Sequence, residues 1–265
     1  MIVEAAPAKL NLALHVRGRR PDGYHELETL FAFVEHGDVV TVEAADTDRF
    51  TLTGPFAQAL AGEGGNLVTR AAVAFGERFG AGAHAITLDK HLPVASGIGG
   101  GSADAAATLR ALGRLHGVST EAMFDIADAL GSDVPACLLG RTAIGRGRGE
   151  QLSTVAGWPG TPVLLVNPGV AVSTAEVFRR WDGVDHGPLG EDWLGGRNDL
   201  EAPARAIAPV IGDVLDLLAA QPGVRFARMS GSGATCFALF DGVDACADAA
   251  KAMRPGWWAQ PTALT

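Results

Sequence analysis

A glycine-rich segment in the middle of the chain holds the residues best suited to chemistry. Residues 97–101 read Gly-Ile-Gly-Gly-Gly, and residues 103–116 have the apolar spacing of a helix. Glycine allows positive φ and close backbone approach, so several N–H groups can converge on one small anion. A helix N-terminus adds unpaired N–H groups and the positive end of a dipole. The segment predicts a phosphate-binding loop, with a flexible turn before an Ala-rich helix as the alternative.

The sequence excludes three common nucleotide-binding motifs. It contains no Gly-Lys-Ser or Gly-Lys-Thr, so it has no Walker P-loop. Ser102 stands where the Rossmann pattern requires glycine. The catalytic loop and the metal-binding triplet of protein kinases are absent as well. The glycine loop therefore belongs to another kind of site.

A lysine and an asparagine lie close together near the start of the chain. Residues 2–16 alternate between apolar and polar types, which predicts a strand with Lys9 and Asn11 on one face. An ammonium group beside an amide can bind a hydroxyl group and stabilise developing charge. Only three of the 21 basic residues are lysine, and the others are arginine. A lysine in this chain therefore indicates a position that requires a compact ammonium group. The alternative is the solvent-facing side of an antiparallel strand.

Two further segments have residue types that suit catalysis. Asp133, in Gly-Ser-Asp-Val-Pro, could orient an alcohol for attack on a phosphoryl group, whose loose transition state depends mainly on orientation. The alternative is an aspartate that caps the next turn. Residues 230–233 form a Ser-Gly-Ser-Gly turn between two apolar runs, and a hairpin would explain that turn on its own.

Taken together, these segments resemble the three motifs of the GHMP kinases, a family of small-molecule ATP-dependent kinases. The motifs are Pro7-x-Lys9-x-Asn11, the glycine loop and residues 228–237, in the order of the family. One departure is Ala103-Asp104, where the family more usually has Ser-Asn or Ser-Ser. The residues that the resemblance assigns to ATP are Asn66, Lys90, Pro93, Gly97, Gly99, Gly100, Gly101, Ser102 and Ala103.

An aromatic pair indicates which acceptor the chain uses. Tyr24 can stack on a planar base, and His25 can hydrogen-bond the edge of that base. The alternative is a partly buried pair in a sheet. The segment Arg-x-Asp-Gly-Tyr-His-x-Leu resembles the branch of the family whose acceptor is a cytidine-diphosphate-linked methylerythritol. The resemblance makes Lys9 and Asp133 catalytic, and the residues it assigns to the acceptor are Asn11, Tyr24, His25, Thr174 and Phe178.

The function implied by the resemblance is ATP-dependent phosphorylation of the 2-hydroxyl group of that acceptor, in non-mevalonate isoprenoid precursor biosynthesis. The expected cofactors are ATP and Mg²⁺, and the sequence identifies no metal ligand. A homoserine- or mevalonate-type kinase is an alternative that Tyr24 and His25 disfavour. A non-catalytic nucleotide sensor is another, which the presence of Lys9 and Asp133 disfavours.

Composition limits the class of protein. The formal net charge of -9 disfavours nucleic acid and anionic membranes as partners, since binding to either depends on basic surfaces. Three cysteines without metal-ligand spacing predict buried free thiols in a reducing compartment. The first residues show no basic-plus-apolar pattern, so we expect no signal segment, and no apolar run reaches membrane-spanning length. We expect a cytoplasmic monomer or homodimer that acts on a small molecule.

The predicted fold is α+β, a mixed α/β arrangement in two layers. The resemblance implies the GHMP kinase fold, with two α/β domains and the active site in the cleft between them. We expect an N-terminal ATP-binding domain over 1–155 and a C-terminal domain over 156–265, because residues 147–160 are rich in glycine. Predicted strands cover 2–16, 27–34, 38–44, 49–53, 86–88, 136–144, 163–166, 224–229, 234–240 and 257–263. Predicted helices cover 66–79, 103–116, 120–131, 174–181, 204–220 and 243–254.

Overall fold

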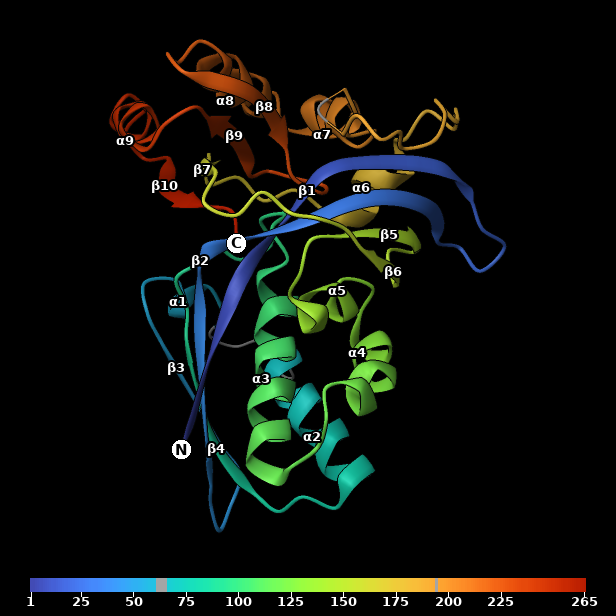
Figure 1. Cartoon of the computed structure of the whole chain (residues 1–265), viewed down its shortest axis with the longest axis vertical. Helices are drawn as coiled ribbons and strands as arrows, with labels where there is room; N and C mark the ends of the chain where they lie inside the picture. The colour runs from blue at the N-terminus through green and yellow to red at the C-terminus, as the bar shows by residue number, and fades with distance from the viewer. Residues whose placement is uncertain (61–65, 194) are drawn as a thin grey trace. The chain divides into compact units, whose positions relative to one another are not determined.

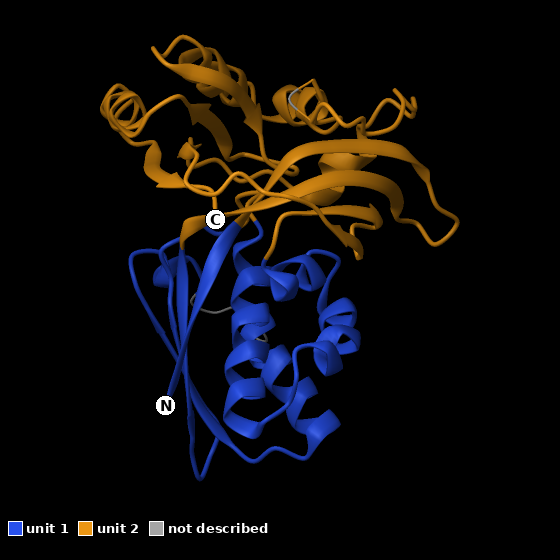
Figure 2. Cartoon of the chain, in the orientation of Figure 1, with its two compact units in different colours: residues 1–8, 37–94, 99–140 blue, residues 9–36, 95–98, 141–265 orange. Residues whose placement is uncertain are grey.

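The computed structural model describes residues 1–60, 66–193 and 195–265, and the chain divides into two compact units (Figures 1 and 2). Unit 1 comprises residues 1–8, 37–94 and 99–140, and unit 2 comprises residues 9–36, 95–98 and 141–265. Both units are discontinuous in sequence. The division into continuous domains at residue 155 stays a prediction.

Unit 1 combines a small sheet with a group of helices on one side of it (Figure 2). Strand β3 (Arg49–Thr53) runs parallel to β4 (His84–Asp89), and β4 pairs antiparallel with residues 39–44 of β2 (His25–Ala44). Residues 2–8 of β1 (Ile2–Arg19) also belong to this unit. Its helices are α1 (Ala57–Leu60), α2 (Leu67–Phe79), α3 (Gly100–His116), η1 (Glu121–Met123), α4 (Phe124–Leu130) and α5 (Val134–Leu139).

Helix α3 is the central helix of unit 1 and packs against α2 and α5. Its alanine-rich first half is buried, since small side chains allow neighbouring elements to approach closely. The helix begins at Gly100, three residues before the predicted start at Ala103, so the last two loop glycines and Ser102 form its first turn. Gly99 precedes it with φ +65°, and Gly117 ends it with φ +70°.

Unit 2 contains a four-stranded antiparallel sheet in the order β10-β7-β9-β8. Residues 27–31 of β2 pair separately with β5, and β5 pairs with β6. The hydrophobic core lies between the four-stranded sheet and helices α8 and α9. The strands are β5 (Ala143–Gly147), β6 (Gln151–Thr154), β7 (Pro162–Asn167), β8 (Val224–Met229), β9 (Cys236–Phe240) and β10 (Trp258–Ala263). The helices are α6 (Thr174–Arg179), α7 (Glu201–Ile207), α8 (Val210–Ala219) and α9 (Val243–Lys251).

Four predicted elements differ in type or continuity in the structure. The strand predicted over 136–144 is wrong, because Val134–Leu139 form α5 and β5 begins only at Ala143. Pro135 in the first turn and Gly140 with φ +60° favour that short helix. The helix predicted over 204–220 is two helices, which separate at Pro209. The strands predicted over 27–34 and 38–44 are one continuous strand, β2.

One expectation from composition, buried free thiols, is confirmed. Cys137, Cys236 and Cys246 are buried free thiols. Within the described residues, no helix combines the length and the apolar character needed to cross a membrane.

Candidate active site

Lys9 and Asn11 form a buried polar pair on β1. Both side chains are 2% exposed, so the alternative of a solvent-facing strand is wrong. The Lys9 ammonium donates to Asn11 Oδ1 at 2.9 Å and lies 5.2 Å from the centroid of the Phe31 ring. Asn11 Nδ2 donates to Thr29 Oγ1 at 2.8 Å, which fixes the orientation of the amide. The pair therefore holds an ammonium group at a defined position, as orientation of a hydroxyl group requires.

Segments of all three motifs meet at Ser230 within unit 2. The fully buried Ser230 Oγ accepts the Asn11 N–H at 3.1 Å and donates to Gly97 O at 3.0 Å. The Lys9 N–H also donates to Ile98 O at 2.9 Å. One serine thus connects the β1 pair to the glycine loop, and Ser230 is a site residue that the sequence indicated only as part of a turn.

Close backbone approach explains two of the motif glycines. A Cβ on Gly97 would lie 2.5 Å from Ser230 O, and φ at Gly97 is +79°. A Cβ on Gly231 would lie 2.9 Å from Gly97 O, with φ at +56°. Any side chain at either position would require backbone to move.

Lys90 lies just before the glycine loop, in a buried cluster of charges in unit 1. Its ammonium donates to a carboxylate oxygen of Asp38 and, at 2.8 Å, to Asp104 Oδ2. Asp38 Oδ1 also accepts the N–H groups of His91 at 2.5 Å and Leu92 at 2.8 Å. Lys90 and both aspartates are at most 2% exposed. The Lys90 ammonium is therefore engaged by protein carboxylates.

Asn66 and Asp133 each lie at the start of a helix in unit 1. Asn66 Oδ1 accepts the Thr69 N–H at 3.0 Å and caps α2. Asp133 occupies the N-cap position of α5, but its side chain makes no capping hydrogen bond, so the alternative role as a side-chain cap is wrong. Lys9 belongs to unit 2 and Asp133 to unit 1. Their action on one hydroxyl group stays a prediction.

His25 lies in an aromatic cluster with Phe178. The two rings stack with centroids 4.8 Å apart and planes 29° apart, and Trp181 meets His25 edge-on at 5.6 Å. Burial lowers the pKa of His25 and the charge of Arg19 lowers it further, so the imidazole is neutral at neutral pH. Its buried Nε2 has no hydrogen-bond partner among the described residues, which suits a nitrogen reserved for a ligand.

Tyr24 is the exposed member of the predicted base site. Its side chain is 52% exposed, and the guanidinium carbon of Arg148 lies 5.1 Å from the ring centroid. The structure thus brings His25 and Phe178 together and leaves Tyr24 accessible. Sequence reasoning missed Trp181, since nothing in its spacing links it to His25.

A second polar link supports the third motif. Thr174 Oγ1, at the start of α6, shares a hydrogen bond of 2.8 Å with Ser232 Oγ. Asn198 Nδ2 donates to Met229 O and to Gly231 O, both at 2.8 Å. Asn198 therefore holds the backbone of the motif, and no local sequence pattern pointed to it.

Comparisons with known proteins agree with this arrangement. Residues 66–141 match the GHMP kinases N terminal domain, and residues 185–255 match the GHMP kinases C terminal model. A 4-diphosphocytidyl-2-C-methyl-D-erythritol kinase of Rhizorhabdus wittichii is 56% identical, and the match covers 96% of this chain and 92% of the relative. The chain belongs to the 4-diphosphocytidyl-2-C-methyl-D-erythritol kinases of the GHMP family. It is therefore a small-molecule kinase, and its family uses ATP.

Further similar proteins belong to the same family. A 4-diphosphocytidyl-2-C-methyl-D-erythritol kinase of Novosphingobium aromaticivorans is 50% identical, over 98% of this chain and 92% of that protein. A crystal structure of a 4-(cytidine 5'-diphospho)-2C-methyl-D-erythritol kinase superposes with a TM-score of 0.86, at 38% identity over 99% of each chain. The mixed α/β fold is thus the GHMP kinase fold, as predicted.

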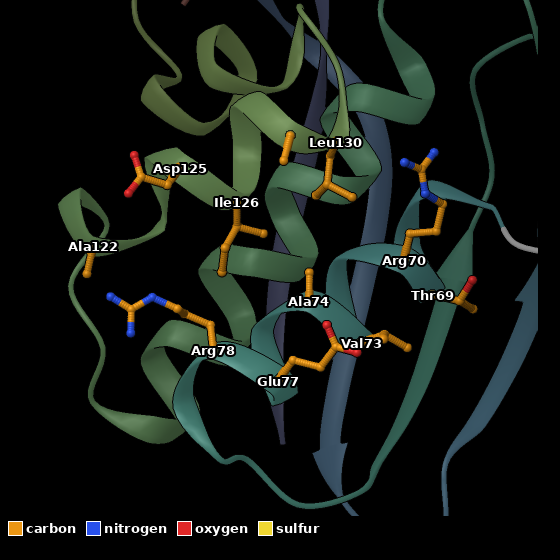
Figure 3. A pocket seen from close by; sticks show the side chains of 11 residues that line it. Thr69, Arg70, Val73, Ala74, Glu77, Arg78, Ala122, Asp125, Ile126 and Leu130 are labelled. Atoms are coloured by element: carbon orange, nitrogen blue, oxygen red, sulfur yellow. The ribbon is translucent and has the colours of Figure 1, made fainter.

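A surface groove in unit 1 is distinct from the predicted site residues. It has a volume of about 820 Å³ and runs between α2 and α4, with Arg70 and Arg78 at opposite ends (Figure 3). The residues that line it are Thr69, Arg70, Val73, Ala74, Glu77, Arg78, Ala122, Asp125, Ile126, Ala129 and Leu130. None of them is a residue predicted to bind ATP or the acceptor.

Proposed function

We propose that this kinase transfers the γ-phosphoryl group of ATP to the 2-hydroxyl group of 4-diphosphocytidyl-2-C-methyl-D-erythritol, in non-mevalonate isoprenoid precursor biosynthesis. The names of relatives at 50% and 56% identity support this acceptor. The structural observation that supports it most directly is the stacking of His25 on Phe178, with the His25 Nε2 atom buried and unpartnered among the described residues. A neutral imidazole beside an aromatic ring can recognise the edge and the face of a cytosine.

Lys9, Asn11 and Asp133 are the residues we propose for the transfer step. The acceptor hydroxyl is on a tertiary carbon, so the nucleophile is crowded and must be held in line with the γ-phosphorus. Lys9 and Asn11 already hold one another at 2.9 Å. Asp133 would orient the hydroxyl group or accept its proton. The role proposed for Asp133 rests on the match of the Gly-Ser-Asp-Val-Pro segment to the family.

We propose that Gly97, Gly99–Gly101, Ser102 and Ala103 hold the phosphates of ATP. N–H groups in the first turn of α3 and in the loop before it would donate to the phosphate oxygens. Asn66, Lys90 and Pro93 are proposed for the adenine side, and Tyr24 and Thr174 for the acceptor. Tyr24 would stack on the base, and Thr174 is positioned by Ser232.

Mg²⁺ is proposed to accompany ATP and to neutralise its phosphates. In the described part of the chain, no group of three or more His, Cys, Asp or Glu side chains could hold a metal ion. The residues therefore do not form a protein cage for Mg²⁺, which commonly keeps waters and binds through nucleotide phosphates. No residue is assigned to it, and no step of the transfer is derived through it.

We further propose a cytoplasmic monomer or homodimer with two domains, 1–155 and 156–265. Neither nucleic acid nor membrane is proposed as a partner, on the net charge of -9.

The experiment that tests the function is ADP formation with purified protein and a panel of acceptors. The cytidine-linked methylerythritol should be turned over, and its uridine-linked analogue should be a poor substrate, because replacing the exocyclic amine by a carbonyl mismatches the base edge. Mevalonate, homoserine and free methylerythritol serve as comparisons. Equal turnover of the cytidine- and uridine-linked compounds would contradict the base site, and preference for homoserine or mevalonate would contradict the acceptor.

A further inference from the structure

Lys90, Asp38 and Asp104, which we call the charge cluster, fix both ends of the glycine loop. Lys90 follows β4 and precedes the loop, whereas Asp104 lies in α3 directly after it. The Lys90 ammonium bonds to both aspartates. Asp38, from β2, also accepts the N–H groups of His91 and Leu92, at the entrance to the loop. The segment that enters the loop and the helix that leaves it are thereby tied to one ammonium group.

Gly100 is the residue that makes room for this ammonium group. A Cβ on Gly100 would lie 3.1 Å from Lys90 Nζ and 3.7 Å from Leu92 Cβ. Its φ is not positive, in contrast to Gly97 and Gly99, so the backbone conformation does not require glycine at this position. Gly100 therefore lets the Lys90 ammonium approach the first turn of α3, the turn that we propose for phosphate binding.

The charge cluster contains two carboxylates for one ammonium group, so its net charge depends on one proton. Burial raises the pKa of Asp104 to about 8, with Lys90 lowering it and Asp38 raising it. Burial therefore favours the neutral form of the cluster, in which the two carboxyl groups hold one proton between them.

Titratable groups of other elements also face α3. His84 of β4 is 4% exposed and shares a hydrogen bond with His116, and Glu4 of β1 pairs with Arg110 and Arg114. Helix α5 carries no ionisable side chain except Cys137, and the charged residues of α2 are all exposed. These are Arg70, Glu77 and Arg78.

We propose that the charge cluster is a positioning device for ATP, in which the Lys90 ammonium, held by Asp38 and Asp104 beside Gly100, sets the first turn of α3. The side chains of Lys90, Asp38 and Asp104 act on the phosphates through the loop and do not touch the phosphates. The proposal rests on the proposed role of the loop in phosphate binding. Ionised Asp104 would place a negative charge near the helix N-terminus and oppose the phosphates.

Calorimetric titration of MgATP between pH 7 and pH 9 tests the proposal on the full chain. The wild-type Kd should rise about tenfold over this range, the order expected for one charge acting over several ångströms of protein. Asp104→Asn keeps the shape of the side chain but cannot ionise, so its Kd should stay within about twofold. Asp125→Asn, the same change at an exposed position on α4, should follow the wild type. The comparison between variants removes the effect of ATP's own titration.

Lys90→Met provides the second readout. It should raise the KM for ATP at least tenfold and leave the KM for the acceptor within about twofold, because only the ATP loop is tied to the cluster. An equal rise of both constants would show a merely structural role and overturn the proposal. A pH profile of Asp104→Asn identical to that of the wild type would overturn it as well, even if Lys90→Met did not fold.

These outcomes are separable from failure of the proposed function. Calorimetry of ATP requires no acceptor, so a wrong acceptor would abolish turnover and leave the ATP titrations unchanged. Absence of ATP binding by the wild type would instead contradict the role of the loop and, with it, the positioning role of the cluster.

Discussion

The two buried lysines, Lys9 and Lys90, donate hydrogen bonds to different kinds of acceptor. The Lys9 ammonium donates to the amide oxygen of Asn11 and lies 5.2 Å from the centroid of the Phe31 ring. Lys90 bonds to two aspartates, which compensate its charge within the protein. An ammonium group that acts on a phosphoryl transfer needs its charge directed at the reaction, whereas a positioning ammonium needs partners that hold it. The two aspartates give Lys90 the partners that a positioning role requires.

Lys9→Arg should lower kcat by about 10²-fold or more with the fold retained. Arginine keeps the charge, but its planar guanidinium is larger than an ammonium group and has no space at a 2% exposed position beside the Phe31 ring. Steady-state kinetics and circular dichroism provide the measurement. Lys251→Arg, on the surface of α9, is the matched control and should change neither kcat nor the fold. Turnover near the wild-type rate in Lys9→Arg would remove Lys9 from the transfer step.

Asp104→Asn should raise stability, and its advantage should grow with pH. The pKa of Asp104 is raised in the folded protein to about 8, from an ordinary value of about 4 in the unfolded chain. Between these values the folded state binds more protons than the unfolded state, so the wild-type free energy of unfolding falls as pH rises and levels off above about 8. Asparagine lacks this titration. Urea unfolding at pH 5, 7 and 9 measures the difference, and a constant difference at all three would contradict the raised pKa.

At the scale of elements, the loop glycines should differ in their tolerance of alanine. Gly97→Ala places a Cβ 2.5 Å from a backbone oxygen at φ +79°, so backbone must shift. The nearest contact of a Cβ in Gly100→Ala is the end of the Lys90 side chain, at 3.1 Å. We expect ATP binding to be lost or weakened at least 100-fold in Gly97→Ala and weakened about tenfold in Gly100→Ala. Gly82→Ala, with open space around it, is the control. A greater loss of ATP binding in Gly100→Ala than in Gly97→Ala would contradict this account.

Substitutions at the aromatic residues near α6 should weaken binding of the acceptor and leave binding of the nucleotide unchanged. Tyr24→Ala removes a stacking face, and Phe178→Ala removes the ring against which His25 is packed at 4.8 Å. Each stacked contact is worth roughly 1–3 kcal/mol, so the KM for the acceptor should rise about 5- to 150-fold while the KM for ATP changes little. Phe226→Ala, a partly buried aromatic on β8, is a control for general destabilisation. A parallel rise of both KM values would argue against a base site here.

The elements that sequence predicted well are those whose signal is local. Helix α2 and strand β8 follow apolar periodicity, and their bounds agree with the prediction to within a residue. Helix α5 was predicted as a strand because a short apolar run has no period that distinguishes helix from strand. Periodicity also cannot show where a long strand continues, as β2 does through residues 35–37.

Prediction of the site was limited in the same way, because sequence patterns reveal only local relations. Lys9 and Asn11 were placed together because strand alternation is local. Ser230, Asn198 and Trp181 act through contacts with residues remote in sequence, and no spacing reveals such contacts. The partners of Lys90 were missed for the same reason, since Asp38 lies on a different strand.

At the scale of the whole molecule, strands β1 and β2 each contribute residues to both compact units. The residues of β1 and β2 are split between the units, and residues 95–98 of the glycine loop belong to unit 2 while their neighbours belong to unit 1. A continuous boundary could be read from sequence, whereas this exchange of segments depends on long-range contacts. Because β2 pairs with β4 in unit 1 and with β5 in unit 2, disrupting it affects both units.

The three free thiols should therefore become reactive together. Cys137 lies in unit 1, whereas Cys236 and Cys246 lie in unit 2, and all three are buried. Burial also raises the pKa of the Cys236 and Cys246 thiols, so reaction requires opening of the structure to form an accessible thiolate. Labelling with an aromatic disulfide, followed by peptide mass spectrometry, should give one rate constant for all three. ATP at 100 times its Kd should slow that rate about 100-fold if opening is global and the open state binds no ATP. The urea-unfolded chain, which should react at once, is the control. Earlier labelling of Cys137 alone would show that unit 1 opens independently and would contradict cooperative unfolding through the shared strands.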